Sequence, residues 1–188
     1  MRNLIKWSCA GIVSVAMLSL SFSAAAKDAE DKLIADLSSR NEQTVVDTLL
    51  AIERQYPTST KAFPTIKKLL TDPRQKVRRK AARVLGVLHA EVDEQNIKDI
   101  CAMLKASDPR EQMDALISLR GLKAGSTVPE ILPLLKSPSP NVIRDACRTL
   151  AVLGNKDLIP AIEPLLTHPD KKVQTDAQDA IYKLKAKT

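Results

Sequence analysis

Few residues of this chain have the types and spacings that support catalysis or metal binding. Its two histidines, His89 and His168, lie 79 positions apart, and neither has a carboxylate or cysteine at the spacing of a metal site. The sequence contains no glycine-rich phosphate loop, no nucleophile elbow and no Cys-x-x-Cys pair. We therefore predict a protein that is not an enzyme and that has no catalytic residue, cofactor or metal ion.

The strongest pattern in the sequence is an internal repeat. The second half of each repeat carries three apolar columns: Ala81, Ala115, Ala146 and Ala177; Leu85, Leu119, Leu150 and Ile181; Leu88, Leu122, Leu153 and Leu184. The first half carries two more: Ile66, Ile100, Ile131 and Ile162; Leu70, Leu104, Leu135 and Leu166. Every column has the spacings 34, 31 and 31. One period thus holds two apolar helical stripes, which is typical of a solenoid built from helix pairs.

Proline-containing turns separate the two stripes of each period. They are Asp72-Pro73, Asp108-Pro109, Ser137-Pro138-Ser139-Pro140 and His168-Pro169. Asp or Ser can cap a helix, and proline fits its first turn. Gly125 and Gly154 are predicted to end second helices in the left-handed conformation. Pro133 and Pro164 fall inside first helices and should shorten or kink them.

These repeats carry a family resemblance. The segments LLTDPRQKVRRKAARVLGVL, ILPLLKSPSPNVIRDACRTLAVLG and, more loosely, AIEPLLTHPDKKVQTDAQDAIYKL resemble HEAT repeats of the short form also found in phycobilisome-lyase-like proteins. The resemblance extends from Phe63 to Leu184. It implies an α-solenoid with a concave and a convex surface and, in most members, a role in holding other macromolecules. The family also includes iron hydroxylases that use His-Glu pairs, and this chain contains no such pair.

Residues 1–26 have the organisation of a secretory signal. Arg2 and Lys6 precede an apolar run from Trp7 to Phe22, and Ala24-Ala25-Ala26 forms a small-residue cleavage site. The run is short for a membrane span, and no second one follows. We predict a cleaved signal and a periplasmic or secreted location in the bacterial envelope; an uncleaved N-terminal anchor is the alternative. Cleavage would lower the formal net charge from +7 to +5.

The remaining chain, residues 27–188, is predicted to form one all-α domain, a right-handed α-solenoid of five helix pairs. Its predicted units are an N-terminal cap over 27–56 and repeats over 60–90, 93–124, 128–154 and 157–185. The cap, with helices over 28–39 and 41–55, lacks the alanine column and the Asp-Pro turn. Terminal repeats are commonly atypical. A separate partner-binding helix pair is the alternative for this segment.

Cys101 and Cys147 are the two cysteines of this domain. An exported chain would meet an oxidising compartment, where disulfides persist. However, the repeat register alone does not bring these two within bonding range. Cys147 shares its repeat position with Ala82 and Leu116, which favours a buried free thiol over a disulfide.

Charged residues form two patterns that could bind a partner. A basic patch contains Lys67, Lys68, Arg74, Lys76, Arg78, Arg79, Lys80 and Arg83, against Asp72 alone. It could attract phosphate, an acidic protein or an anionic membrane, or it could be a solvated surface whose arginine stems cover apolar neighbours. Nucleic acid is disfavoured as the partner, because aromatic residues that stack on bases are missing and the export signal points away from the nucleoid.

The second pattern is an acidic column. Asp114, Asp145 and Asp176 each precede the repeat alanine, and Lys80 holds the same position in the earlier repeat. Arg83, Arg148 and Asp179 lie three residues further along. These rows predict either a structural ladder of alternating charge between repeats or an acidic groove for a cationic partner. The partner-binding candidates are Arg79, Lys80, Arg83, Asp114, Asp145, Arg148, Asp176 and Asp179.

We therefore predict a non-catalytic scaffold or assembly factor that binds a protein partner on the solenoid surface. One alternative is an enzyme or enzyme accessory of the phycobilin-lyase kind, which would need a chromophore pocket lined by aromatic residues. The other is a binder of anionic surfaces or nucleic acid through the basic patch. Strong salt dependence would distinguish this last alternative from the scaffold.

Overall fold

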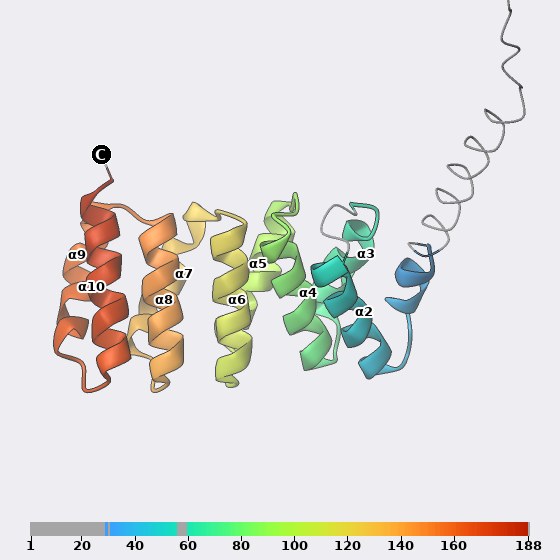
Figure 1. The fold of residues 1–188 in the computed structure, drawn as a ribbon, viewed down its shortest axis with the longest axis horizontal. Helices are drawn as coiled ribbons and strands as arrows, with labels where there is room; N and C mark the ends of the chain where they lie inside the picture. The colour runs from blue at the N-terminus through green and yellow to red at the C-terminus, as the bar shows by residue number, and fades with distance from the viewer. Residues whose placement is uncertain (1–28, 30, 56–59, 188) are drawn as a thin grey trace, which may run out of the picture.

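The structure is a computed structural model that describes residues 29, 31–55 and 60–187, and these form an all-helical solenoid (Figure 1). Its helices are α2 (Glu42–Gln55), α3 (Phe63–Lys68), α4 (Gln75–Val87), α5 (Glu94–Met103), α6 (Pro109–Gly121), α7 (Val128–Ile131), α8 (Pro140–Leu153), α9 (Ile159–Ile162) and α10 (Lys171–Lys185). Residues 31–36 are also helical and precede α2. The predicted α-solenoid is confirmed.

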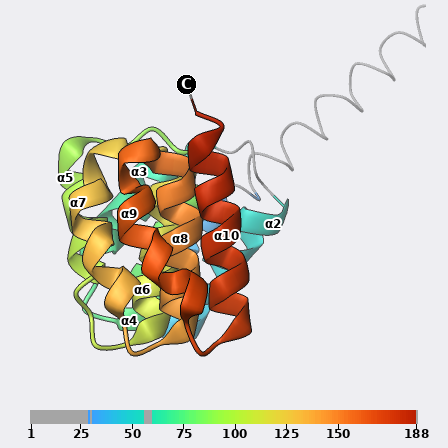
Figure 2. The ribbon, with the colours of Figure 1, turned by 90° about the vertical axis from the view of Figure 1, so that its left-hand side faces the viewer.

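The helices form two layers. The second helix of each pair, α2, α4, α6, α8 or α10, packs against the second helix of the next pair, so these five stand side by side (Figure 1). The first helices, α3, α5, α7 and α9, form the other layer, which the view along the solenoid separates from α8 and α10 (Figure 2). We call the outer surface of α2, α4, α6, α8 and α10 the second-helix face.

The core lies between the two layers and contains the predicted apolar columns. The alanines of the repeat are all fully buried: Ala81, Ala115, Ala146 and Ala177. Leu166 is the exception among the predicted core residues, because it is 41% exposed while its neighbour Leu165 is buried. No further helix pair follows in the described residues to cover this position.

Proline shortens the first helices of the last two repeats, as predicted. The α-helices α7 and α9 each continue as a 3₁₀ segment, over Leu132–Lys136 and Glu163–Thr167. Pro133 and Pro164 occupy the second position of these segments. A proline has no N–H to donate, and its ring crowds the carbonyl of the preceding turn, so the α-helical pattern stops there.

The predicted Asp cap is confirmed at α6, whereas α4 and α8 begin without a side-chain cap and His168 does not cap α10. Asp108 caps α6, accepting a hydrogen bond from a first-turn N–H at 2.9 Å, and Pro109 takes the first helical position. In the last repeat the cap is Asp170 instead of His168, whose Nδ1 accepts a hydrogen bond from the Asp170 N–H at 3.0 Å. Asp170 is the cap because its carboxylate accepts hydrogen bonds from two free N–H groups of α10.

The glycine prediction is wrong. Neither Gly125 nor Gly154 has a positive φ; the left-handed positions after α4 and α6 belong to His89 (φ 51°) and Lys123 (φ 54°). After α8 the chain leaves the helix through Gly154 in an extended conformation, with φ −91° and ψ −174°. Different second helices therefore end in different ways, although their repeats align.

Two other glycines allow α4 and α6 to approach closely. A Cβ atom on Gly86 would overlap the backbone of Ser118, and one on Gly121 would overlap the backbone of Gly86. Both residues lie within helices, where glycine is otherwise unfavourable by up to about 1 kcal/mol relative to alanine. Glycine is needed at both positions because a side chain there would hold the two helices further apart.

The predicted signal segment, residues 1–26, lies outside the described residues, so its cleavage stays a prediction. Within residues 29, 31–55 and 60–187, none of the helices has the length and apolar character needed to cross a membrane.

The first prediction concerns this close approach. Replacing Gly86 by alanine should lower the free energy of unfolding by about 1–3 kcal/mol, because the new methyl group overfills the α4–α6 contact. Gly125→Ala is the matched control: its Cβ would meet only the Leu153 carbonyl oxygen, at an ordinary 3.6 Å. Urea unfolding of both variants measures the difference. Equal stability of the two variants would contradict the close packing described here.

Candidate functional site

Two arginines of α4 hold one aspartate of α6. Arg79 Nε lies 2.9 Å from Asp114 Oδ2, and Arg83 Nη1 lies 3.7 Å from Asp114 Oδ1. The arginines are four residues apart, so they project from the same side of the helix toward its neighbour. We call this arrangement, two arginines of one second helix around one aspartate of the next, an arginine–aspartate clasp.

The same clasp recurs between α8 and α10. Arg144 Nε lies 2.6 Å from Asp176 Oδ2, and Arg148 Nε lies 3.0 Å from Asp176 Oδ1. Asp176 is 8% exposed, so its ion pairs are little screened by water. Charge-assisted hydrogen bonds of this length are among the stronger polar contacts in proteins. The clasps therefore link adjacent second helices across their outer face.

The junction between α6 and α8 lacks a clasp. Its two arginine positions are occupied by Met113 and Ile117, which are half-buried. Asp145, the aspartate of this junction, is 7% exposed, and its one ion-pair partner among the described residues is Arg148 of its own helix, at 3.4 Å. Burial raises the pKa of the Asp145 carboxyl, against the opposing effect of Arg148 and Arg120.

Arg120 is the second group at this junction without a close partner. Its guanidinium is half-buried, and burial lowers its pKa although Asp145 lies near enough to oppose that effect. Its one hydrogen bond runs from Nη1 to Thr149 Oγ1 at 3.5 Å, the outer limit for such a bond. No ion pair joins Arg120 to a carboxylate in the part of the chain that the structure describes.

A cleft of about 390 Å³ opens beside Arg120 on the second-helix face. It is lined by Arg120, Arg148, Ala151, Val152, Asp176, Asp179, Ala180 and Lys183. Ala151 and Ala180 are buried and small, whereas Val152 is 47% exposed. Asp179 and Lys183 are exposed, and neither makes a hydrogen bond or ion pair with another described residue. We call this the second-helix cleft.

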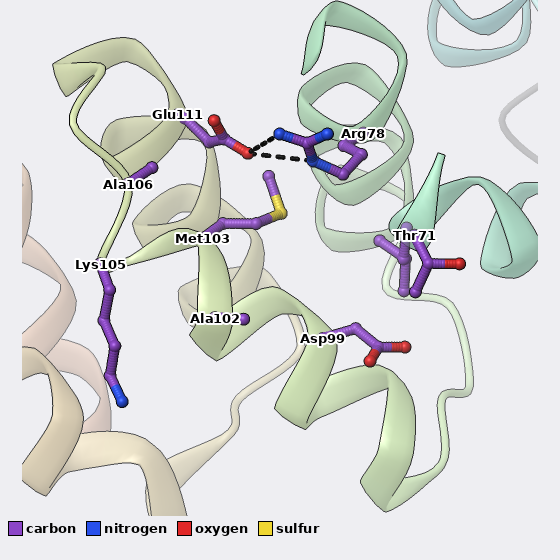
Figure 3. Close-up of a pocket in the computed structure, with 9 residues that line it drawn as sticks. Thr71, Arg78, Asp99, Ala102, Met103, Lys105, Ala106 and Glu111 are labelled. Carbon is purple, nitrogen blue, oxygen red and sulfur yellow. Dashed lines mark hydrogen bonds and ion pairs between the residues drawn. The ribbon is translucent and has the colours of Figure 1, made fainter. Parts of the chain in front are cut away.

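A second cavity, of about 370 Å³, lies between η1 (Leu69–Thr71), α4, α5 and α6 (Figure 3). Its charged groups hold one another: Arg78 donates to Glu111 Oε1 through Nε at 3.2 Å and Nη2 at 3.0 Å. Glu111 is 3% exposed, and its other oxygen accepts from Gln75 at 2.9 Å. The arginine of this cavity therefore has its counter-ion, whereas half-buried Asp99 accepts, among the described residues, only a hydrogen bond from Gln95, at 2.9 Å.

Most of the predicted basic patch is paired with neighbouring residues. Besides the contacts of Arg78, Arg79 and Arg83, the pairs are Arg74 with Asp72 at 2.7 Å and Lys76 with Glu42 at 3.4 Å. Lys80 is half-buried and makes no hydrogen bond or ion pair with a described residue. The arginines of the patch thus link repeats to one another.

The structure brings most of the predicted partner-binding residues together on the second-helix face. Arg79, Arg83, Asp114, Arg148 and Asp176 form the clasps, Asp145 lies between them, and Asp179 lines the cleft. Sequence reasoning missed Arg120, Arg144 and the interruption at Met113 and Ile117. The signal was present as Arg-x-x-x-Arg in the second and fourth repeats, replaced by Met-x-x-x-Ile in the third.

Cys101 and Cys147 are both free thiols. Burial raises the pKa of Cys147 to about 12 and that of Cys101 to about 11, so neither is a reactive thiolate near neutral pH. Among the described residues, no group of three or more His, Cys, Asp or Glu side chains is placed to hold a metal ion.

These features define an α-solenoid of stacked helix pairs with a charged, clefted second-helix face. Residues 97–182, from α5 to α10, match the protein family of HEAT repeats. No curated protein matches the chain.

Several solved structures share the fold. One is the complex of CpcE and CpcF of phycocyanin lyase from Nostoc sp. PCC7120, with 24% identity, a TM-score of 0.71 and coverage of 82% of this chain and 64% of that chain. Another is a designed armadillo repeat protein in complex with the peptide (KR)4, with 18% identity, a TM-score of 0.60 and coverage of 81% and 80%. This chain thus spans less than two thirds of the lyase chain.

The second prediction compares two aspartates of equal burial. Asp176→Asn should destabilise the fold by about 2 kcal/mol at neutral pH, because it weakens two charge-assisted hydrogen bonds. Asp145→Asn should cost about 1 kcal/mol less, because it removes a buried charge that has one ion pair of 3.4 Å among the described residues, whereas Asp176 has two shorter ones. Urea unfolding at neutral pH measures both, and equal losses would contradict the unequal pairing.

The pH dependence of Asp145→Asn provides the control. The raised pKa means that the folded state favours the protonated Asp145 carboxyl. The stability that this protonated group contributes is present below the unfolded-state pKa of 3.8 and is lost as pH rises through the raised pKa of the folded state. The free energy of unfolding of Asp145→Asn, relative to that of the wild type, should therefore be higher at neutral pH than in acid. A stability difference between variant and wild type that changed with pH in the opposite direction would contradict the raised pKa of Asp145.

Proposed function

We propose that this chain is a non-catalytic scaffold or assembly factor of the bacterial envelope that binds a protein partner on its second-helix face. The observation that carries the proposal is the interrupted clasp between α6 and α8. It leaves Met113, Ile117 and Arg120 on a face whose other arginines hold carboxylates of the neighbouring repeat. Mixed apolar and arginine surface of this kind is common at the centre of protein interfaces.

The similar structures support a binding role. Two of them contain a partner: CpcE is in complex with CpcF, and the designed armadillo repeat protein is in complex with a peptide. Repeat proteins also present extended surfaces that suit binding of other chains. These likenesses support a scaffold, and they transfer no substrate or reaction to this chain.

The two alternatives receive less support from the described residues. A lyase-like chromophore pocket would need aromatic side chains, and Phe63 and Tyr182 are the only aromatic residues in the described ranges. Binding of an anionic surface or nucleic acid would need a cluster of free cations, whereas five of the eight basic residues of the patch are paired with carboxylates.

The third prediction tests the face. A photo-reactive amino acid at Val152, on the second-helix face, should cross-link a discrete protein in intact cells. The same probe at Ala161, an exposed residue of α9 in the other layer, is the matched control and should not capture that protein. Mass spectrometry of the captured species reads the result. Equal capture at both positions, or capture of nucleic acid at Val152, would overturn the proposal.

The envelope location is tested separately. Mass spectrometry of the N-terminal peptide should find a chain that begins near Lys27, and fractionation should place it outside the cytoplasm. A cytoplasmic chain that retains Met1 would overturn the envelope part of the proposal without affecting the cross-linking result.

A further inference from the structure

The second-helix cleft is the one cavity described above that contains a half-buried arginine without a carboxylate partner. Arg120 is partly removed from water, and its single hydrogen bond is long. A guanidinium has five N–H donors, so most of its donors remain available. In the cavity between α4, α5 and α6, by contrast, Arg78 and Glu111 satisfy each other.

The repeat register explains why this cleft occurs at one place. Residues equivalent to Arg120 in the preceding and following repeats are Gly86 and Ala151. Gly86 lies against Ser118, so a large side chain cannot stand there. At Ala151 the small side chain leaves open space, and the arginine of α6 borders that space together with residues of α8 and α10. The guanidinium of Arg120 therefore borders the open space beside Ala151.

The charges of the cleft leave a small positive excess. Arg120, Arg148 and Lys183 face Asp176 and Asp179 across the cleft. Arg144 and Arg148 are balanced by Asp176 and Asp145. Arg120 and Lys183 then stand against Asp179 alone, which leaves one positive charge in excess to attract a further anion. The volume of about 390 Å³ lies near the lower end of the range for small ligand pockets, roughly 300–1,000 Å³.

We propose that the second-helix cleft binds the side-chain carboxylate of an acidic residue in an extended segment of the protein partner. Arg120 and Lys183 bind the carboxylate, and the aliphatic stem of that residue lies on Ala151, Val152 and Ala180. This inference rests on the proposed scaffold function and adds the chemistry of the partner.

A carboxylate fits these charges better than a phosphate. A phosphate monoester carries close to two negative charges at neutral pH, and Asp179 lines the same cleft with an unpaired negative charge. A single carboxylate matches the small positive excess and can accept two parallel N–H bonds from the arginine fork. Asp179 can at the same time accept a hydrogen bond from a backbone N–H of the bound segment.

The fourth prediction uses a peptide probe. The full domain should bind a short peptide of alternating Glu and Ser, with blocked termini, and should not bind the same peptide with Gln in place of Glu. Arg120→Gln should weaken binding about tenfold, the effect expected for loss of one charge-assisted hydrogen bond. Lys80→Gln is the matched control, because it removes the same charge from the same face outside the cleft, and it should change affinity less than about twofold. Fluorescence anisotropy measures each affinity.

The fold of Arg120→Gln is checked by thermal unfolding, which should match the wild type because the side chain makes one weak hydrogen bond. Equal affinity of the two variants, or no binding of the Glu peptide to the wild type, would overturn the carboxylate site. Either result leaves the scaffold proposal intact, because the cross-linking at Val152 does not depend on the chemistry of the partner. A peptide that binds only through its free C-terminal carboxylate would also overturn the site, and an unblocked Gln peptide tests for it.

Discussion

The distance between neighbouring second helices governs what their outer face can do. Small residues set that distance where the helices touch: Gly86 lies against Ser118, and Thr149 donates a hydrogen bond to the backbone carbonyl of Leu116 at 3.3 Å. At this separation an arginine of one helix reaches an aspartate of the next. The ion pairs on the face are therefore a consequence of close backbone packing, and the regular repeat of the apolar columns supplies that packing.

The clasps also explain how one junction differs from the others. Two junctions use paired arginines around a buried aspartate, whereas the α6–α8 junction has Met113 and Ile117 in the same positions. That exchange leaves Asp145 and Arg120 with weak contacts inside a solenoid whose other buried charges are mostly well paired. Binding sites commonly depart from the rules that stabilise the rest of a fold. For this reason we propose that a partner binds at the interruption.

The sequence predicted the fold well because burial is encoded in residue spacing. The alanine and leucine columns identified the repeats, and Pro133 and Pro164 identified the shortened first helices. The site was harder to predict, because a pairing between helices depends on rotation and distance that spacing alone does not determine. Asp114 and Asp176 were recognised as a charged column, but their shared arginine partners were not. The repeat pattern does not predict Arg120 as a site residue, because its repeat equivalents, Gly86 and Ala151, carry no charge.

The most direct test of this account compares two double-mutant cycles, one for Arg148 with Asp176 and one for Arg120 with Asp145. The coupling free energy isolates the pairwise interaction from the other effects of each substitution. We expect a coupling of at least about 1 kcal/mol for the clasp pair and a clearly smaller one for Arg120 with Asp145, which act on each other without a hydrogen bond or ion pair. Equal coupling in both cycles would contradict it, because Arg120 would then be a structural counter-ion with no charge left for a partner.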